Sequence, residues 1–200
     1  MKKSNDAKKY FTQKNITVID IVAGIALAAA LVMVIIYSGY ARTYFIGIAL
    51  IPAAVLVFSR TSKVKDSEYD AMTKKIAADN GIPITGEYVV HEYDLDAQPV
   101  KIGSDQRARS AKYVVGKFEF SNKKCVLTRW EIDVINASVS SDTHELGEGD
   151  QMMLLSEERE INGKKRPFAH IALSGAHNFT IPVAARSTDG DSIVERFGRM

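Results

Sequence analysis

Two long apolar stretches, separated only by residues 38–43, constrain this 200-residue chain more than any other feature. The first stretch runs from residue 16 to about residue 37, and the second runs from residue 44 to residue 58. About 20 apolar residues in a helix cross the roughly 30 Å hydrocarbon core of a bilayer. After Asp20 the first stretch holds no charged residue, so it lacks the polar face of a soluble amphipathic helix. We therefore expect a two-helix transmembrane hairpin over residues 16–59.

The second stretch is shorter and contains Pro52, which removes one helix hydrogen bond. Arg42 and Arg60 flank it and can extend to the headgroups, which compensates for a short span. The connection between the stretches is too short to hold a domain, so the helices must be antiparallel neighbours. Small residues let membrane helices approach closely, although they are also simply common in such helices. The candidates for this contact are Gly24, Ala26, Ala28, Ala30, Gly47, Ala49 and Ala53.

Basic residues flank the hairpin on one side. Five lysines precede the first stretch, and three basic residues soon follow the second, whereas the connection holds only Arg42. The flanking residues are Lys2, Lys3, Lys8, Lys9, Lys14, Arg60, Lys63 and Lys65. The positive-inside rule then places both termini in the cytoplasm, with residues 1–15 as a basic cytoplasmic tail. The alternative is a signal peptide cleaved near residues 39–41, but the first stretch exceeds a signal core of about 7–15 residues and a second stretch follows it.

Asp20 is the one carboxylate within the first apolar stretch. A charged group inside a span is costly and often belongs to a proton or ion pathway. Asp20 lies in the first turn of the expected helix, however, where the positive end of the helix dipole favours an acid. The interfacial interpretation is therefore preferred over the functional one.

Residues 60–81 are expected to form a helix that links the hairpin to the rest of the chain. Tyr69, Met72, Ile76 and Ala77 recur at helical spacing and would form its apolar stripe. Asp66 or Ser67 can cap its start, and Asn80-Gly81 followed by Pro83 would end it.

From residue 82 to residue 200 the pattern changes to short runs with alternating apolar residues, which are typical of β-strands. Asn162-Gly163 between two such runs predicts a tight hairpin turn. The expected strands cover residues 85–93, 98–103, 111–120, 124–130, 131–139, 150–160, 166–173 and 178–185. A short helix over residues 192–197 would close the chain. This order predicts a β-rich cytoplasmic domain, either a small barrel or a sandwich, with a C-terminal helix.

Three segments give this domain a resemblance to a known architecture. They are the hairpin-rich run YVVGKFEF with KKCVLTRW, the later pair FAHIALSG with HNFTIPV, and the closing IVERF. In this order the region from Ala111 to Phe197 resembles the pleckstrin-homology-like (PH-like) domains of bacterial membrane proteins. The resemblance is architectural and covers less than half of the chain. It implies loops or a groove that bind lipids, peptides or partner proteins.

The composition offers little specific chemistry. A net charge of +2, with short basic clusters such as residues 164–166, argues against nucleic-acid binding. The single cysteine, Cys125, is interpreted as a small core residue at the start of a strand. The four histidines lack metal-ligand spacing, although His170 and His177 straddle an expected hairpin and could share one face. We therefore predict no catalytic, cofactor-binding or metal-binding residues and no cofactor.

These features predict a membrane-tethered, non-enzymatic binding or scaffolding protein that presents its β-rich domain at the cytoplasmic face. Its expected partners are the lipid bilayer and a protein at the membrane, and not nucleic acid. One alternative is an accessory subunit of a membrane transport or secretion complex. The other is an enzyme that acts at the membrane surface.

Overall fold

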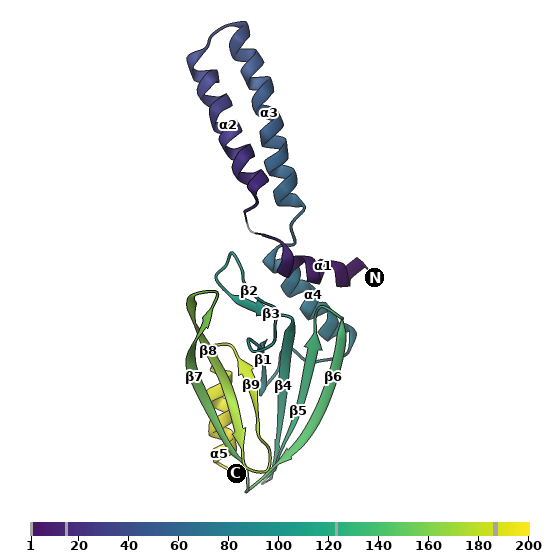
Figure 1. Ribbon diagram of the computed structural model, residues 1–200. Coiled ribbons are helices and arrows are strands. Elements are labelled where there is room, and N and C mark those ends of the chain that lie inside the picture. The colour runs from purple at the N-terminus through teal and green to yellow at the C-terminus, as the bar shows by residue number, and fades with distance from the viewer. Residues whose placement is uncertain (1, 15, 123, 186–187) are drawn as a thin grey trace. The chain divides into compact units, whose positions relative to one another are not determined.

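The computed structural model describes residues 2–14, 16–122, 124–185 and 188–200 (Figure 1). The chain forms two compact units. One unit is continuous and comprises residues 12–65. The other joins the N-terminal segment up to residue 11 with residues 66–200, so the first unit is inserted within its sequence.

The inserted unit is a pair of antiparallel helices, α2 (Val18–Ile36) and α3 (Tyr40–Thr61). Both are long and apolar enough to cross a membrane, which matches the two apolar helices expected over residues 16–59. Helix α3 extends beyond the predicted stretch at both ends and keeps Pro52 inside it. Residues 60 and 61, expected in the linker, therefore belong to α3.

Alanines rather than glycines make the contact between α2 and α3. Ala23, Ala30 and Ala49 are buried in this pair. A Cβ atom added at Gly24 or Gly47 would meet no atom within 4 Å. Of the candidates for this contact, Ala30 and Ala49 therefore lie in it and the two glycines do not; on α2 the contact follows Ala23 and Ala30, two helical turns apart.

Asp20 connects the start of α2 to the end of α3 and the residues that follow it. It forms a capping box with Thr17, in which the Thr17 N–H donates to the carboxylate at 2.7 Å. The Ser59 hydroxyl of α3 donates to the same carboxylate, and Lys63 Nζ lies 3.0 Å from it. Asp20 thus lies in the first turn of α2, as expected, and also joins α2 to α3.

The second unit contains two antiparallel sheets and a small hairpin. The four-stranded sheet has the order β1 (Val89–Tyr93), β4 (Lys112–Ser121), β5 (Lys124–Asp133), β6 (Ser138–Leu146). The three-stranded sheet has the order β7 (Gln151–Ile161), β8 (Lys164–Ser174), β9 (Phe179–Val183). The hairpin of β2 (Val100–Ile102) and β3 (Ala108–Ser110) lies between β1 and β4 in sequence. The chain ends in α5 (Asp189–Gly198), which begins earlier than expected.

The mainly β character of this unit is as predicted, but two strands were missed. Residues 124–130 and the start of 131–139 form one strand, β5, and the next strand, β6, was not predicted. Strand β3 was not predicted either. The Asn162-Gly163 turn is confirmed: it joins β7 to β8, and both residues have positive φ, as a type I′ turn requires.

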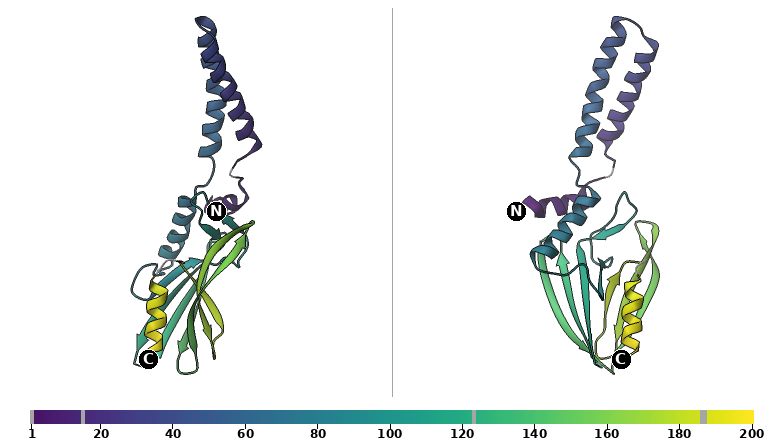
Figure 2. Two further views of the ribbon diagram at one scale, coloured as in Figure 1. Left: turned by 90° about the vertical axis from the view of Figure 1, so that its left-hand side faces the viewer. Right: turned by 180° about the vertical axis from the view of Figure 1, so that it is seen from behind.

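The core lies between the two sheets and is closed by α5. Strand β9 lies beside β1 and β4, and a Cβ atom at Gly116 would sit 3.2 Å from Ile181, so the sheets approach closely there. Helix α5 lies behind the sheets in Figure 1 and in front of them in the right view of Figure 2. Its Ile193 is fully buried in the same core as Leu127 and Ile171.

Helix α4 packs on the other face of the four-stranded sheet, and a further helix packs on α4. Helix α4 (Asp66–Asp79) buries Tyr69, Thr73 and Ala77; Tyr69 and Ala77 were expected in its stripe, and Thr73 was not. Within the basic tail expected over residues 1–15, residues 2–12 form a further helix that was not predicted, α1 (Lys2–Thr12). The ring of Tyr10 holds this helix in place, because it is buried and stacks on Tyr69 with 4.3 Å between centroids.

Candidate ligand-binding cleft

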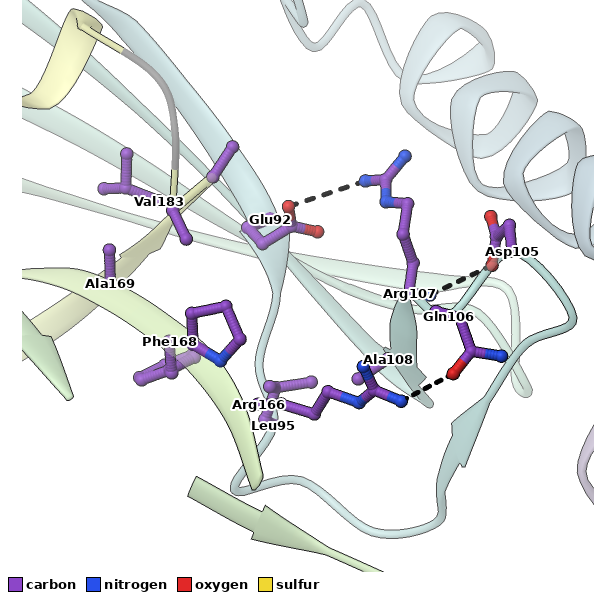
Figure 3. A pocket seen from close by; sticks show the side chains of 13 residues that line it. Glu92, Leu95, Asp105, Gln106, Arg107, Ala108, Arg166, Phe168, Ala169 and Val183 are labelled. Atoms are coloured by element: carbon purple, nitrogen blue, oxygen red, sulfur yellow. Dashed lines mark hydrogen bonds and ion pairs between the residues drawn. The ribbon is translucent and has the colours of Figure 1, made fainter. Parts of the chain in front are cut away.

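A cleft of about 680 Å³ opens at one end of the space between the two sheets (Figure 3). Four parts of the β-rich unit line it: the end of β1 with the loop after it, the β2–β3 turn, the start of β8, and the end of β9. The lining residues are Glu92, Leu95, Asp105, Gln106, Arg107, Ala108, Arg166, Pro167, Phe168, Ala169, Val183, Ala184 and Ala185. A volume of several hundred Å³ is in the range of small-molecule and peptide sites.

The floor of the cleft is apolar. Ala169 and Val183 are buried side chains on the core face of β8 and β9, and Leu95 contributes from the loop after β1. Phe168 is also buried and lines the cleft from the opposite face of β8. The guanidinium of Arg159 lies 4.0 Å from the centroid of the Phe168 ring, which holds that ring in place. The small side chains of Ala169 and Val183 leave the end of the core open to solvent at this point.

The rim of the cleft is charged. Glu92 lies on the same face of β1 as the core residue Val90, so it points into the space between the sheets. Arg107 Nη2 lies 3.5 Å from Glu92 Oε2. From the other side Arg166 Nη2 donates a hydrogen bond of 2.7 Å to Gln106 Oε1, so that Arg166 reaches from β8 to the β2–β3 turn (Figure 3).

Arg166 is incompletely satisfied in this position. Within the described ranges of the chain its guanidinium forms no ion pair, and its Nε is buried without a hydrogen-bond partner. The residue directly opposite on β7 is another arginine, Arg159. Arg159 is neutralised by Asp96 and Glu157, but Arg166 is not. Like charges directly opposite in a sheet repel each other.

The β2–β3 turn holds the rim residues in place. Its backbone closes through a hydrogen bond of 2.8 Å from the Gly103 N–H to the Arg107 carbonyl. A Cβ atom at Gly103 would lie within 3 Å of side-chain atoms of Arg109, Asp105 and Asp66. The turn therefore requires glycine at this position, because these charged side chains converge around it.

Behind the turn, Arg109 forms a buried ion-pair cluster. Its side chain is only 1 % exposed and donates two hydrogen bonds to Asp70 at 2.7 Å and two to Asp105 at 2.7 and 2.9 Å. Asp70 also accepts from the Tyr93 hydroxyl at 2.9 Å. Such paired, charge-assisted bonds fix the geometry strongly. Arg109 thereby connects α4 to the turn that lines the cleft.

Asp66 extends this cluster to α1. Its carboxylate accepts from the Tyr10 hydroxyl at 2.8 Å and from the Ser104 hydroxyl and N–H at 2.6 and 2.7 Å. Burial raises the pKa of Asp66, but these hydrogen bonds outweigh it and the net pKa is lowered. The Asp66 carboxylate thus binds the turn and α1 through these contacts, whereas the sequence suggested it as a helix cap.

Asp105 and the arginines of the cleft keep their charges at neutral pH. The hydrogen bonds from Arg109 lower the pKa of Asp105 from its usual 3.8 to about 2. Asp105 is therefore ionised at neutral pH, and arginine does not release its proton there. An acid or base that acts in catalysis needs a pKa near the working pH. These groups can orient and bind a charged ligand, but Asp105 and the arginines are poorly suited to transfer protons.

No protein-family model, curated protein or solved structure matches this chain. The cleft is therefore interpreted from its own geometry.

The histidines are arranged differently from the sequence expectation. His170 lies within β8 opposite Pro182, whereas His177 lies in the β8–β9 loop. His177 instead approaches His144, with 5.0 Å between ring centroids, and each ring contacts its own aspartate, Asp150 or Asp142. Among the residues that the structure describes, no group of three or more His, Cys, Asp or Glu side chains is arranged to hold a metal ion.

Cys125 is fully buried in the core, as expected, and its pKa is raised to about 12 by burial.

The sequence did not identify the rim of the cleft. Glu92, Arg107 and Arg166 come from three separate elements, so no local motif connects them. The one available signal was the basic cluster at residues 164–166, of which only Arg166 lines the cleft.

Proposed function

We propose that the protein is a membrane-tethered, non-enzymatic binding protein, whose β-rich domain binds a partner molecule in the cleft between its two sheets. The observation that carries this proposal is the cleft itself, because it combines an apolar floor with a rim of oriented charges. Ligand sites typically have this composition. The partner is expected at the cytoplasmic face of the membrane.

The exposed apolar surface of the hairpin supports its insertion in lipid. Ile35 is 82 % exposed, Val18 76 % and Phe58 75 %, and most other large side chains of α2 and α3 are also exposed. Each such side chain gains about 1.5–3 kcal/mol when it leaves water. The basic residues on both flanks of the hairpin support cytoplasmic termini.

Two short segments join the hairpin to the rest of the chain, which supports a closely tethered domain. Residues 13–17 join α1 to α2, and residues 62–65 join α3 to α4. The domain is then held at the membrane surface, where its effective concentration for membrane-bound partners is high.

The order of elements supports a PH-like domain. A four-stranded antiparallel sheet precedes a three-stranded one, and a helix follows that packs into their common core. In this interpretation the β2–β3 hairpin is an insertion between the first two strands of the domain. Part of the cleft is lined by this insertion.

Membrane insertion is tested with the full-length chain in its native cells. We expect the protein to remain in the membrane fraction after alkaline carbonate extraction and to be released by detergent. Protease added outside intact cells should leave the β-rich domain uncut, whereas protease added to opened cells should digest it. Digestion from outside would contradict the proposed topology.

Binding at the cleft is tested by site-specific photo-crosslinking in native membranes. A benzophenone residue at Gln106, on the rim, should give a discrete adduct. The same residue at Glu119, an exposed position of β4 outside the cleft, is the control. Equal adducts from both positions, or none from Gln106, would contradict binding in the cleft.

A further inference from the structure

We propose that the cleft recognises a carboxylate carried on a short apolar group, and that Arg166 is the residue that binds the carboxylate. This inference rests on the proposed function, since it names the ligand class of the same cleft.

The state of Arg166 indicates an anionic ligand. Its guanidinium faces Arg159 across the sheet, forms no ion pair among the residues described, and leaves its Nε buried without a partner. Its one hydrogen bond is to the neutral amide of Gln106. An anion on the rim would supply the missing charge and replace a neutral acceptor with a charged one, which strengthens the hydrogen bond.

The charge balance of the rim favours a monoanion over a dianion. Arg107 is paired with Glu92, whereas Asp105 shares the single charge of Arg109 with Asp70, so these groups keep a net negative charge beside Arg166. Among the rim residues that the structure describes, Arg166 is the cation that forms no ion pair. A phosphate monoester would bring about two negative charges close to Glu92 and Asp105, and like charges at short range repel. A carboxylate brings one charge and matches the planar fork of a guanidinium.

The floor of the cleft supplies the apolar part of the ligand site. Ala169, Val183 and Phe168 line the cleft together with Arg166, and Leu95 is drawn close to Arg166 in Figure 3. A ligand whose carboxylate is held by Arg166 would direct an attached apolar group onto this surface. Burial of that group provides affinity, and the ion pair provides orientation.

Two kinds of ligand carry a carboxylate on an apolar group. One is the C-terminus of a protein chain that ends in an apolar residue, and the other is a free aliphatic acid. The inference concerns their shared group, and separate arms of the experiment distinguish them.

The experiment uses the full-length protein in lipid nanodiscs and isothermal titration calorimetry. The first arm compares the peptide acetyl-Ala-Ala-Leu as its free acid with the same peptide as its amide. The second arm compares octanoate with octanamide, and empty nanodiscs correct for partition into lipid. We expect the acid of at least one pair to bind about 10- to 100-fold more tightly than its amide, the difference typical of a hydrogen bond to a charged group.

Three variants test whether the tighter binding of the acid depends on the cleft. Arg166→Gln should reduce the affinity for the acid to that for the amide. Arg199→Gln, at an exposed arginine in the last turn of α5, should leave it unchanged. Ala184→Leu fills the half-exposed edge of the cleft and should weaken binding of acid and amide alike. Thermal unfolding checks that each variant remains folded.

The outcomes separate the two proposals. A preference for the peptide acid identifies a protein C-terminus, and a preference for octanoate identifies a free aliphatic acid; each supports the inference. Equal binding of acids and amides, no binding in either arm, or an unchanged affinity of Arg166→Gln would overturn it. A cleft-specific crosslink from Gln106 would in that case leave the proposed binding function intact.

Discussion

Replacing Arg109 tests whether the buried ion-pair cluster holds the β-rich domain together. Arg109→Met keeps most of the side-chain volume but removes four hydrogen bonds to Asp70 and Asp105. Removing one partner of a buried ion pair costs about 3–5 kcal/mol, because the remaining charges stay uncompensated. The whole stability of a domain is about 5–15 kcal/mol. We therefore expect the variant to lose a large fraction of its unfolding free energy.

The assay is urea unfolding of the full-length chain in a mild detergent, followed by fluorescence. Trp130 is the only tryptophan of the chain and lies in β5, so its signal reports the β-rich unit. Arg199→Met is the matched control: Arg199 pairs with Glu195 on the surface, and such pairs contribute about 0–1 kcal/mol. A loss for Arg109→Met no larger than that for the control would refute the structural role of the cluster.

The acid dependence of stability gives a second, independent readout. The folded pKa of Asp105, about 2, lies below its usual 3.8, so its contribution is present above pH 4 and is lost as the pH falls toward 2. The full shift corresponds to about 2.4 kcal/mol. Because the Asp105 side chain is 41 % exposed, solvent screening reduces this to about 1 kcal/mol. Arg109→Met should lack this part of the slope between pH 4 and pH 2.

Three further predictions concern other parts of the chain. Cys125, with a pKa of about 12, should react with thiol reagents only after the domain unfolds; rapid labelling of the native protein would contradict its burial. Asp20→Asn weakens the link between α2, Ser59 and Lys63, so trypsin should cut at Lys63 about fivefold faster, whereas an unchanged rate would argue against this link. Burial raises the pKa of Tyr10 and of Tyr69 above the usual 10, so their contribution to stability is complete below pH 10 and is lost as the pH rises above it. The part of the tyrosinate absorbance that Tyr10→Phe removes should appear only together with the change in Trp130 fluorescence; its appearance near pH 10 without unfolding would contradict this.

The sequence predicted those parts of the fold that follow from a strong local pattern. The apolar helices rest on long runs without charge, and the β7–β8 turn rests on Asn162-Gly163. Strand β6 was missed because its residues are mostly polar, and of its nine residues only Leu146 is buried. Helix α1 was missed because its lysines dominate its composition, whereas its packing depends on Ala7 and Tyr10.

The cleft could not be predicted for a different reason. Arg166 is notable only because of what surrounds it: Arg159 lies opposite, Gln106 accepts its hydrogen bond, and Glu92 is already paired with Arg107. These relations join β1, the β2–β3 turn and β8, and they arise only when the two sheets face each other. Sequence patterns describe single elements, so they carry no information on such a site.

The division of the β-rich unit by the hairpin has a consequence for biosynthesis. Helix α1 is translated first, but Tyr69 and Asp66, which hold Tyr10, follow the whole hairpin in the chain. Nascent α1 must therefore wait until both apolar helices have left the ribosome before it can dock. Docking of α1 is thus possible only after the whole hairpin has been synthesised, and a chain stalled before that stage would leave the Tyr10 ring exposed.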